Sequence, residues 1–214
     1  MIGMNMRKYI SAAAAFLFSA AALPLFSAAG PAEEPVEITD LTEFNAGLEK
    51  MTSSVNSIDS RFEQRKYMDV LQRDVVTSGT FSFVRPDKIR MQYDAPVDYA
   101  IVMDSESVTI ISGGTENSTP VQGNPVFSQI RNMMMACMTG DLSVLGEDFS
   151  VKHYEDGAQY LVVLRPENSF IREYIAGMEL RFDKETMALL SLKMMEDGAD
   201  STEYRFSDIK YNLH

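Results

Sequence analysis

The most informative part of this chain begins as Arg61-Phe62-Glu63-Gln64 and resumes as Gly79-Thr80-Phe81-Ser82-Phe83-Val84-Arg85-Pro86-Asp87-Lys88-Ile89-Arg90-Met91-Gln92-Tyr93-Asp94-Ala95-Pro96. Apolar and polar residues alternate on both sides of the Arg85-Pro86 step, which is typical of strands with one buried face. We therefore expect half-buried antiparallel strands in this part of the chain.

Further strands are predicted from the same alternation. Tyr99, Ile101 and Met103 form one series, and Val108 and Ile110 begin another. A glycine pair at 113–114 and the polar run 115–119 predict a loop. Later strands are expected at residues 160–164, 178–182, 188–194 and 204–211, with turns at 156–157 and 197–198.

Two helices are predicted beside these strands. Apolar residues recur at helical spacing from Leu41 to Ile58, behind Asp40 and Glu43 as a candidate N-cap pair. A second helix is expected over residues 126–138. The pattern predicts an α+β fold that is mainly β, in which a strongly curved antiparallel sheet forms an incomplete β-barrel with helices over its concave side.

The first residues have the pattern of a cleavable export signal. Arg7 and Lys8 precede an apolar run, and small residues follow at 27–29. A transmembrane anchor is the alternative, but the run is rich in Ala and Ser, is broken by Pro24, and lacks a charged stop-transfer flank. We expect a signal peptide at 1–29, a flexible leader at 30–37 and one domain at 38–214.

Charge and cysteine content narrow the function. The formal charge of −12 falls to −14 when Arg7 and Lys8 are removed, which argues against nucleic acid and anionic lipid surfaces as partners. Cys137 is the only cysteine, so no internal disulfide is expected. No Cys lies near the cleavage site, so the chain has no residue there to become a lipoprotein itself.

Enzyme motifs are absent from the sequence. His153 and His214 are the only histidines, and the chain has no Gly-x-Ser-x-Gly, His-x-x-x-His or Cys-x-x-Cys motif. A Cys137–His153 dyad is the alternative, but Cys137 lies in an apolar segment typical of an inert buried thiol. We expect no catalysis, no metal and no cofactor.

The hairpin motif resembles the periplasmic outer-membrane lipoprotein carriers, the LolA-type chaperones. In that family a Phe-x-Gln strand leads through a Gly-x-Phe/Leu-x-Phe/Val-x-Arg-Pro hairpin into a strand that carries an aromatic. A Pro and an apolar strand that ends at Asp follow, here Tyr99 to Asp104. A second block, Gly123-Asn124-Pro125-Val126-Phe127-Ser128-Gln129-Ile130-Arg131-Asn132, resembles the family's lid helix. The resemblance covers roughly residues 40–210, with specific motifs between 55 and 132.

The resemblance implies the fold and a cargo. The carriers are incomplete β-barrels with a helical lid, and they shield the acyl chains of lipoproteins between the inner and outer membranes. An ATP-driven, ABC-type lipoprotein-releasing complex of the inner membrane would load such a carrier, and an outer-membrane lipoprotein acceptor would empty it. We expect a periplasmic monomer that binds no nucleic acid.

The resemblance also assigns Arg85 as the lid latch. Its position matches the family's Arg before Pro, which hydrogen-bonds backbone carbonyls at the lid and holds the empty cavity shut. A guanidinium carries five donors in a rigid fork and suits the carbonyls at a helix C-terminus. An Arg at the surface of an exposed turn is the alternative.

An acyl cavity needs adaptable apolar side chains, and methionine supplies them. Consecutive Met133, Met134 and Met135 cannot all face inward from one helix, so at least one should be exposed or gated. Ile89 and Met91 stand where better-known carriers have an aromatic and a Trp. The lining residues that we predict are Phe81, Phe83, Ile89, Met91, Tyr93, Ile101, Met103, Phe127, Ile130 and Met134.

The charge distribution suggests a docking surface. Between residues 61 and 90 the sequence has seven basic and four acidic residues. From 141 to 214 it has fifteen acidic and eight basic residues. We predict that Lys88 and Arg90 dock on an acidic membrane partner, with an ordinary mixed surface as the alternative. Two other functions stay open: a lipid-sensing regulatory module of the same fold, and a carrier of another lipid such as a fatty acid or a glycolipid.

Overall fold

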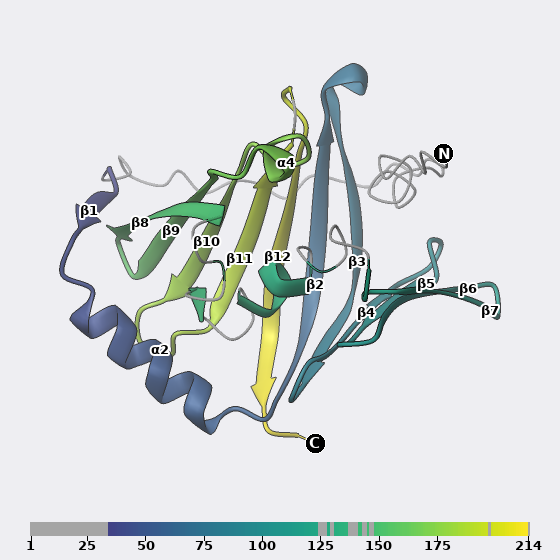
Figure 1. The fold of residues 1–214 in the computed structure, drawn as a ribbon, viewed down its shortest axis with the longest axis horizontal. Helices are drawn as coiled ribbons and strands as arrows, with labels where there is room; N and C mark the ends of the chain where they lie inside the picture. Colours follow the sequence, from purple (N-terminus) through teal and green to yellow (C-terminus); the bar gives the residue numbers. More distant parts are fainter. Residues whose placement is uncertain are drawn as a thin grey trace, which may run out of the picture.

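The computed structural model describes residues 34–123, 128, 131–136, 141, 142, 145, 148–196 and 198–213. Twelve strands form one sheet in the order β1-β8-β9-β10-β11-β12-β2-β3-β4-β5-β6-β7 (Figure 1). Every neighbouring pair is antiparallel. The sheet therefore consists of two meanders, β8 to β12 and β2 to β7, which join where β12 pairs with β2.

The elements vary widely in length. Helical elements within the described residues include α2 (Thr42–Ser54), the 3-10 turn η2 (Asp69–Leu71) and α4 (Ser169–Arg172). Residues 131–136 are also helical. The strands are β1 (Val36–Ile38), β2 (Ser57–Met68), β3 (Arg73–Val84), β4 (Lys88–Tyr93), β5 (Tyr99–Met103), β6 (Ser107–Ser112), β7 (Thr115–Pro120), β8 (Phe149–Asp156), β9 (Gln159–Pro166), β10 (Gly177–Asp183), β11 (Leu189–Met195) and β12 (Ser201–Tyr211).

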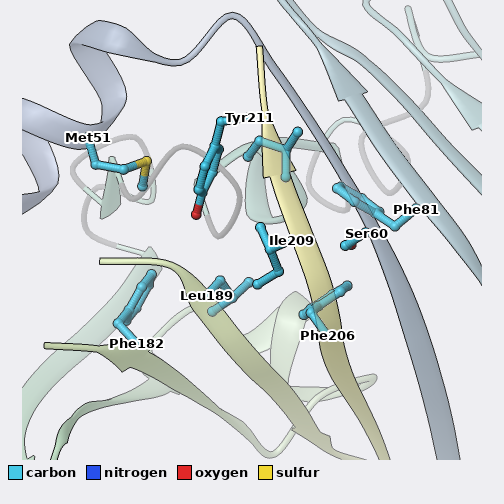
Figure 2. Close-up of a pocket in the computed structure, with 9 residues that line it drawn as sticks. Met51, Ser60, Phe81, Phe182, Leu189, Phe206, Ile209 and Tyr211 are labelled. Carbon is cyan, nitrogen blue, oxygen red and sulfur yellow. The ribbon is translucent and has the colours of Figure 1, made fainter. Parts of the chain in front are cut away.

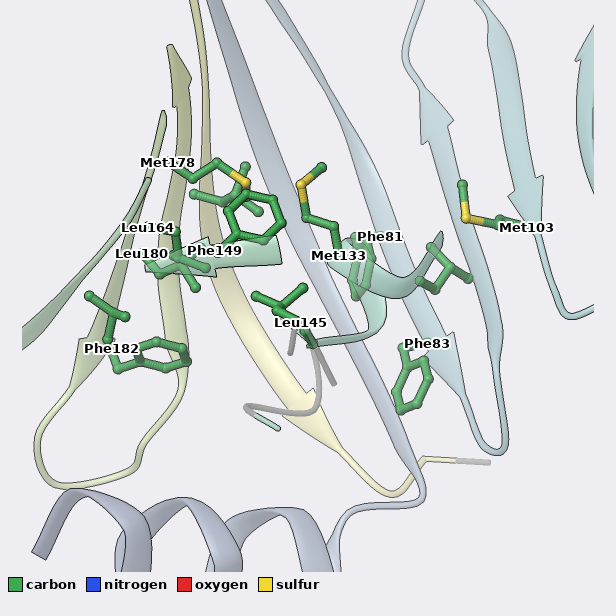
Figure 3. Close-up of a cluster of buried hydrophobic side chains, with 14 of the residues drawn as sticks. Phe81, Phe83, Met103, Met133, Leu145, Phe149, Leu164, Met178, Leu180 and Phe182 are labelled. Carbon is green, nitrogen blue, oxygen red and sulfur yellow. The ribbon is translucent and has the colours of Figure 1, made fainter. Parts of the chain in front are cut away.

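One face of the sheet carries the core. Alternate residues of the strands point to this face because side chains in a strand alternate, and we call it the inner face. Figure 3 shows Phe81 and Phe83 of β3 on one side of the core and Leu180 and Phe182 of β10 on the other. Buried Met133 of the 131–136 helix lies between them, so this helix covers the inner face.

Helix α2 lies across the same face near the ends of the strands (Figure 1). Its buried residues are Phe44 and Leu48, four apart and therefore on one side of the helix. The Phe44 ring packs edge-on against His153, Tyr160 and Phe182, with ring centroids 4.9, 5.2 and 5.9 Å away. These rings join α2 to β8, β9 and β10, and edge-on aromatic pairs add to the apolar burial.

The mainly β, antiparallel fold that we predicted is confirmed, but its curvature is not. The sheet is neither closed nor strongly curled, so the incomplete barrel was wrong. The edge strands explain this, because β1 has three residues and all but one residue of β7 are exposed. Closing these edges would bury little apolar surface.

Several local predictions also need correction. Residues 115–119, expected to be a loop, form most of β7, which pairs with β6 after a two-residue turn at Gly113-Gly114. The helix predicted to reach Ile58 ends at Ser54, and Ile58 lies in β2. Val36 and Glu37, placed in the leader, pair with β8. The predicted signal peptide lies outside the described residues.

Gly79 is required by the close packing of β3. It pairs with Phe62 on β2 and with Tyr93 on β4. A Cβ atom at this position would lie 2.0 Å from the Gln92 carbonyl oxygen and 2.7 Å from the Phe62 ring. The rings of Phe62 and Tyr93, with centroids 5.0 Å apart, therefore meet over a site that has no side chain.

We expect Gly79→Ala to lower the free energy of unfolding by about 3 kcal/mol, because backbone and a buried ring must both move. Urea unfolding followed by circular dichroism measures this change. Thr80→Ala, at an exposed position of the same strand, is the matched control and should change it by less than about 0.5 kcal/mol. Equal losses in the two variants would contradict this account.

Candidate functional site

An apolar pocket lies between the end of α2 and the inner face of the sheet (Figure 2). Met51 reaches it from α2, Phe81 from β3, and Phe206 from β12. Ser60 supplies a polar group to its wall. The pocket thus spans the seam between the two meanders, and its lining residues are Met51, Ile58, Ser60, Phe81, Phe182, Leu189, Phe206, Ile209 and Tyr211.

The free space in this pocket is small. It amounts to about 20 Å³, which is room for roughly one water molecule. Drug-sized ligands occupy pockets of about 300–1,000 Å³. This pocket is therefore closed to a long-chain ligand, and α2, which borders it, must move before such a ligand enters.

Arg85 holds the end of α2 that borders this pocket. Its Nε donates a hydrogen bond of 2.6 Å to the carbonyl of Val55, and its guanidinium NH2 donates to the carbonyl of Thr52. Its backbone N–H donates to the Asn56 carbonyl at 2.9 Å. The last turn of a helix has carbonyls without helical partners and a partial negative charge, so a cation stabilises it.

Asn212 holds the same helix end from the other side. Its Nδ2 donates to the Ser54 carbonyl at 2.9 Å, and its Oδ1 accepts from the Asn56 N–H at 2.7 Å. The residue has a positive φ of 58°, a conformation that Asn tolerates better than most residues. The segment after β12 and the β3–β4 turn therefore fix the end of α2 together.

The β3–β4 turn, residues 85–87, also contacts the second covering helix. The Arg131 guanidinium lies 3.3 Å from the Asp87 carboxylate, and both side chains are largely buried, with 25% and 15% exposed. This one turn thus binds α2 through Arg85 and the 131–136 helix through Asp87. Sequence reasoning assigned no role to Asp87 or Arg131.

Lys88 and Arg90 follow this turn on β4. Lys88 is exposed, whereas Arg90 is partly buried and donates a 2.7 Å hydrogen bond to Gln92 Oε1. The two alternate with buried Ile89 and Met91, so they lie on the outer face. Nearby, hydrogen bonds from the Ser107 and Glu106 N–H groups hold the pKa of Asp104 below its usual range, with smaller contributions from Lys88 and Arg131.

The predicted lining residues occupy the inner face. Phe81, Phe83, Ile89, Met91, Tyr93 and Met103 are buried, and Ile101 and Met134 pack against the same core. Of these, Phe81 borders the pocket. Phe127 and Ile130 lie outside the described residues.

The motif did not identify the lining residues from β10, β11 and β12. These are Phe182, Leu189, Phe206, Ile209 and Tyr211. Phe182 and Tyr211 are aromatic residues within strands that the alternation did predict. The sequence did not predict that β12 pairs with β2, and this pairing brings the lining residues of β10, β11 and β12 to the side of the sheet where Phe81 lies.

Among the described residues, no group of three or more His, Cys, Asp or Glu side chains is placed to hold a metal ion. No helix within the described ranges is both long enough and apolar enough to cross a membrane.

Comparison with known proteins identifies the family. The family model described as "Outer membrane lipoprotein carrier protein LolA" matches residues 53–214. The "Outer-membrane lipoprotein carrier protein" of Pseudomonas paraeruginosa is 23% identical over 171 residues, which cover 78% of this chain and 79% of that protein.

Solved structures are more remote. A putative outer membrane lipoprotein-sorting protein domain from Vibrio parahaemolyticus has a TM-score of 0.44 and 11% identity, covering 80% of this chain and 92% of its own. The MucA/MucB complex of Pseudomonas aeruginosa has a TM-score of 0.46 and 13% identity, and the match covers 80% of this chain and 57% of the chain in that complex. The family match spans most of the sequence and includes the Arg85 hairpin: the chain belongs to the LolA family of outer membrane lipoprotein carrier proteins.

Proposed function

We propose that this protein is a periplasmic carrier that shields the acyl chains of lipoproteins on their way from the inner to the outer membrane. The observation that carries the proposal is the apolar pocket under α2, whose bordering helix end is clamped by Arg85. The LolA family is non-enzymatic, which agrees with a role in binding and release. The predicted signal peptide would bring the chain to the periplasm.

The cargo explains why such a pocket must be gated. Burial of an acyl chain gains about 0.8 kcal/mol per CH₂ group, so a triacylated anchor does not cross water unaided. A carrier must cover this surface and later release it. The free energy needed to open the closed pocket lowers the affinity for the cargo and so favours release.

Arg85 is the latch in this proposal, and it acts on α2. The guanidinium donates to two carbonyls at the helix end that borders the pocket, next to Met51 in the wall. Movement of α2 away from the sheet breaks both hydrogen bonds. Because Arg85 is exposed to water, the clamp contributes a modest energy that a bound acyl chain can offset.

Loading and unloading require membrane partners. An inner-membrane ABC-type lipoprotein-releasing complex would deliver the cargo, and an outer-membrane lipoprotein acceptor would take it. Lys88 and Arg90 directly follow the turn that binds both covering helices. An acidic partner surface docked there would lie beside the latch, which favours release at the point of contact.

The proposal is tested by purifying the protein from the periplasm under mild conditions and identifying bound molecules by native and lipid mass spectrometry. We expect triacylated lipoprotein to co-purify and to accumulate on Arg85→Leu. Without the Arg85 hydrogen bonds, closure of α2 over the pocket no longer favours release of the cargo. Arg205→Leu, which removes an exposed arginine of β12 paired with Glu203, is the control and should match wild type.

The other outcomes separate the alternative functions. A free fatty acid or glycolipid as the sole ligand would assign the protein to a different lipid cargo. An empty protein that captures a signalling partner would support a lipid-sensing regulatory module.

The latch also has a direct physical readout. Arg85→Leu removes two hydrogen bonds from the last turn of α2, so we expect the amides of residues 42–54 to exchange with deuterium about tenfold faster. Hydrogen–deuterium exchange of the empty protein measures this. Unchanged exchange in α2 would show that Arg85 does not hold the helix.

The docking role of Lys88 and Arg90 is tested by reversing their charges. We expect the double variant Lys88→Glu/Arg90→Glu to bind cargo normally but to slow its transfer to outer-membrane acceptor several-fold, with the defect growing at low salt. Transfer of a labelled lipoprotein from purified carrier to acceptor gives the rate. An unchanged rate would remove the docking idea.

A further inference from the structure

A cluster of polar side chains lies on the inner face, farther along the strands from the apolar pocket. The Tyr93 hydroxyl donates a 2.6 Å hydrogen bond to Gln64 Oε1, and the hydroxyls of Tyr93 and Tyr204 are 3.4 Å apart. The Tyr99 ring stacks on Tyr93 with centroids 4.4 Å apart. With Thr77, which pairs with Gln64, these residues form what we call the tyrosine cluster.

The strand register explains why these groups meet. Gln64 on β2 lies between Thr77 on β3 and Tyr204 on β12. The Tyr93 hydroxyl reaches it across Gly79, where no side chain intervenes. With Tyr99 on β5, the cluster is therefore built from five strands around the seam between the two meanders.

The cluster and the pocket share one continuous face. Ser60, in the pocket wall, and Gln64 are both buried residues of β2 and point to the same side of the strand. Four residues of a strand span about 14 Å. An extended chain in the pocket therefore has room to run along β2 toward the cluster once the covering helices move.

Two groups of the cluster have unused hydrogen-bonding capacity. Thr77 Oγ1 and the Tyr99 hydroxyl are buried, and neither makes a hydrogen bond of ordinary length and angle to any described residue, the Tyr99 hydroxyl having only an interaction of poorer geometry with that of Tyr93. A buried polar group without a partner costs about 1–3 kcal/mol. A ligand that accepts hydrogen bonds from these hydroxyls would recover that free energy.

The chemistry of the cluster points to a neutral acceptor. Its donors are hydroxyl and amide groups, and the neighbouring cation on this face, Lys66, is already paired with Glu196 at 3.1 Å. Burial raises the pKa of Tyr99 to about 12 and that of Tyr93 far above its usual value, so both keep their protons near neutral pH. Such donors suit ester and amide carbonyls, whereas phosphates favour Arg, Lys or helix N-termini.

We propose that the tyrosine cluster binds the ester and amide carbonyls that link acyl chains to the polar part of the cargo, while the chains occupy the apolar pocket. This inference rests on the proposed carrier function and specifies its ligand. It predicts that the protein distinguishes acylated anchors from hydrocarbon chains of equal length by their carbonyl groups.

The test compares two matched ligands. One is a synthetic triacylated lipopeptide with ester and amide links, and the other is its analogue with ether and amine links, which lacks those carbonyls. We expect the wild-type mature protein to bind the ester ligand about five- to tenfold more tightly, as one or two hydrogen bonds would provide. Displacement of a fluorescent apolar probe gives both Kd values.

Thr77→Val and Tyr99→Phe each remove one hydroxyl and keep the shape of the side chain. We expect each to weaken ester binding severalfold, to leave ether binding unchanged, and to leave the Tm equal or higher, because a buried group without a partner is removed. Thr80→Val, on the exposed face of the same strand as Thr77, is the matched control and should alter neither affinity.

Each contrary result has a definite meaning. Equal wild-type affinity for the two ligands would overturn the carbonyl site and leave the acyl carrier standing. Equal losses for both ligands in Thr77→Val would overturn it too, because they indicate a structural role. Binding of neither ligand would contradict the carrier function and the site together.

Discussion

The arrangement of the molecule depends on a single turn, residues 85–87. Arg85 binds the carbonyls at the end of α2, and Asp87 binds Arg131 of the other covering helix. The turn is the tip of the β3–β4 hairpin, whose strands are held in register by a full ladder of hydrogen bonds. A rigid hairpin thus adds directional hydrogen bonds and an ion pair to the apolar contacts of both helices with the inner face, and apolar contacts are not directional.

The two links differ in how water affects them. Arg85 is exposed, so each of its hydrogen bonds contributes about 1 kcal/mol or less in net terms. The Asp87–Arg131 pair is mostly buried, and separating its charges without hydrating them would cost more. α2 is therefore the easier of the two covering helices to release, and the 131–136 helix is the harder one. Asn212 also donates a hydrogen bond to the end of α2, so release of the helix requires the hydrogen bonds of both Arg85 and Asn212 to break.

Local sequence patterns predicted the individual strands and helices. They did not predict which strands and side chains far apart in the sequence come together. Alternation located the β3–β4 hairpin and the later strands because each pattern lies within a few residues. β7 was missed because its residues are polar on both faces, and the end of α2 was misplaced because Val55 and Ile58 continue the helical spacing into β2. The resemblance brought out Arg85, but its partners Thr52 and Val55 depend on where α2 lies on the sheet. Asn212, far along the chain from α2, gave no signal at all.

The inner face combines two kinds of surface that a purely structural core would keep apart. A core packs best with apolar groups, yet this one places Gln64, Thr77 and three tyrosines on the same face as the pocket. Two of their hydroxyls make no hydrogen bond of ordinary length and angle to any described residue, and burying such a group costs about 1–3 kcal/mol. A ligand with carbonyls at the head of its acyl chains would satisfy the hydroxyls and fill the pocket in one step. The closed, empty state would then be less stable than its packing alone allows, and this deficit helps a ligand to open the clamp on α2.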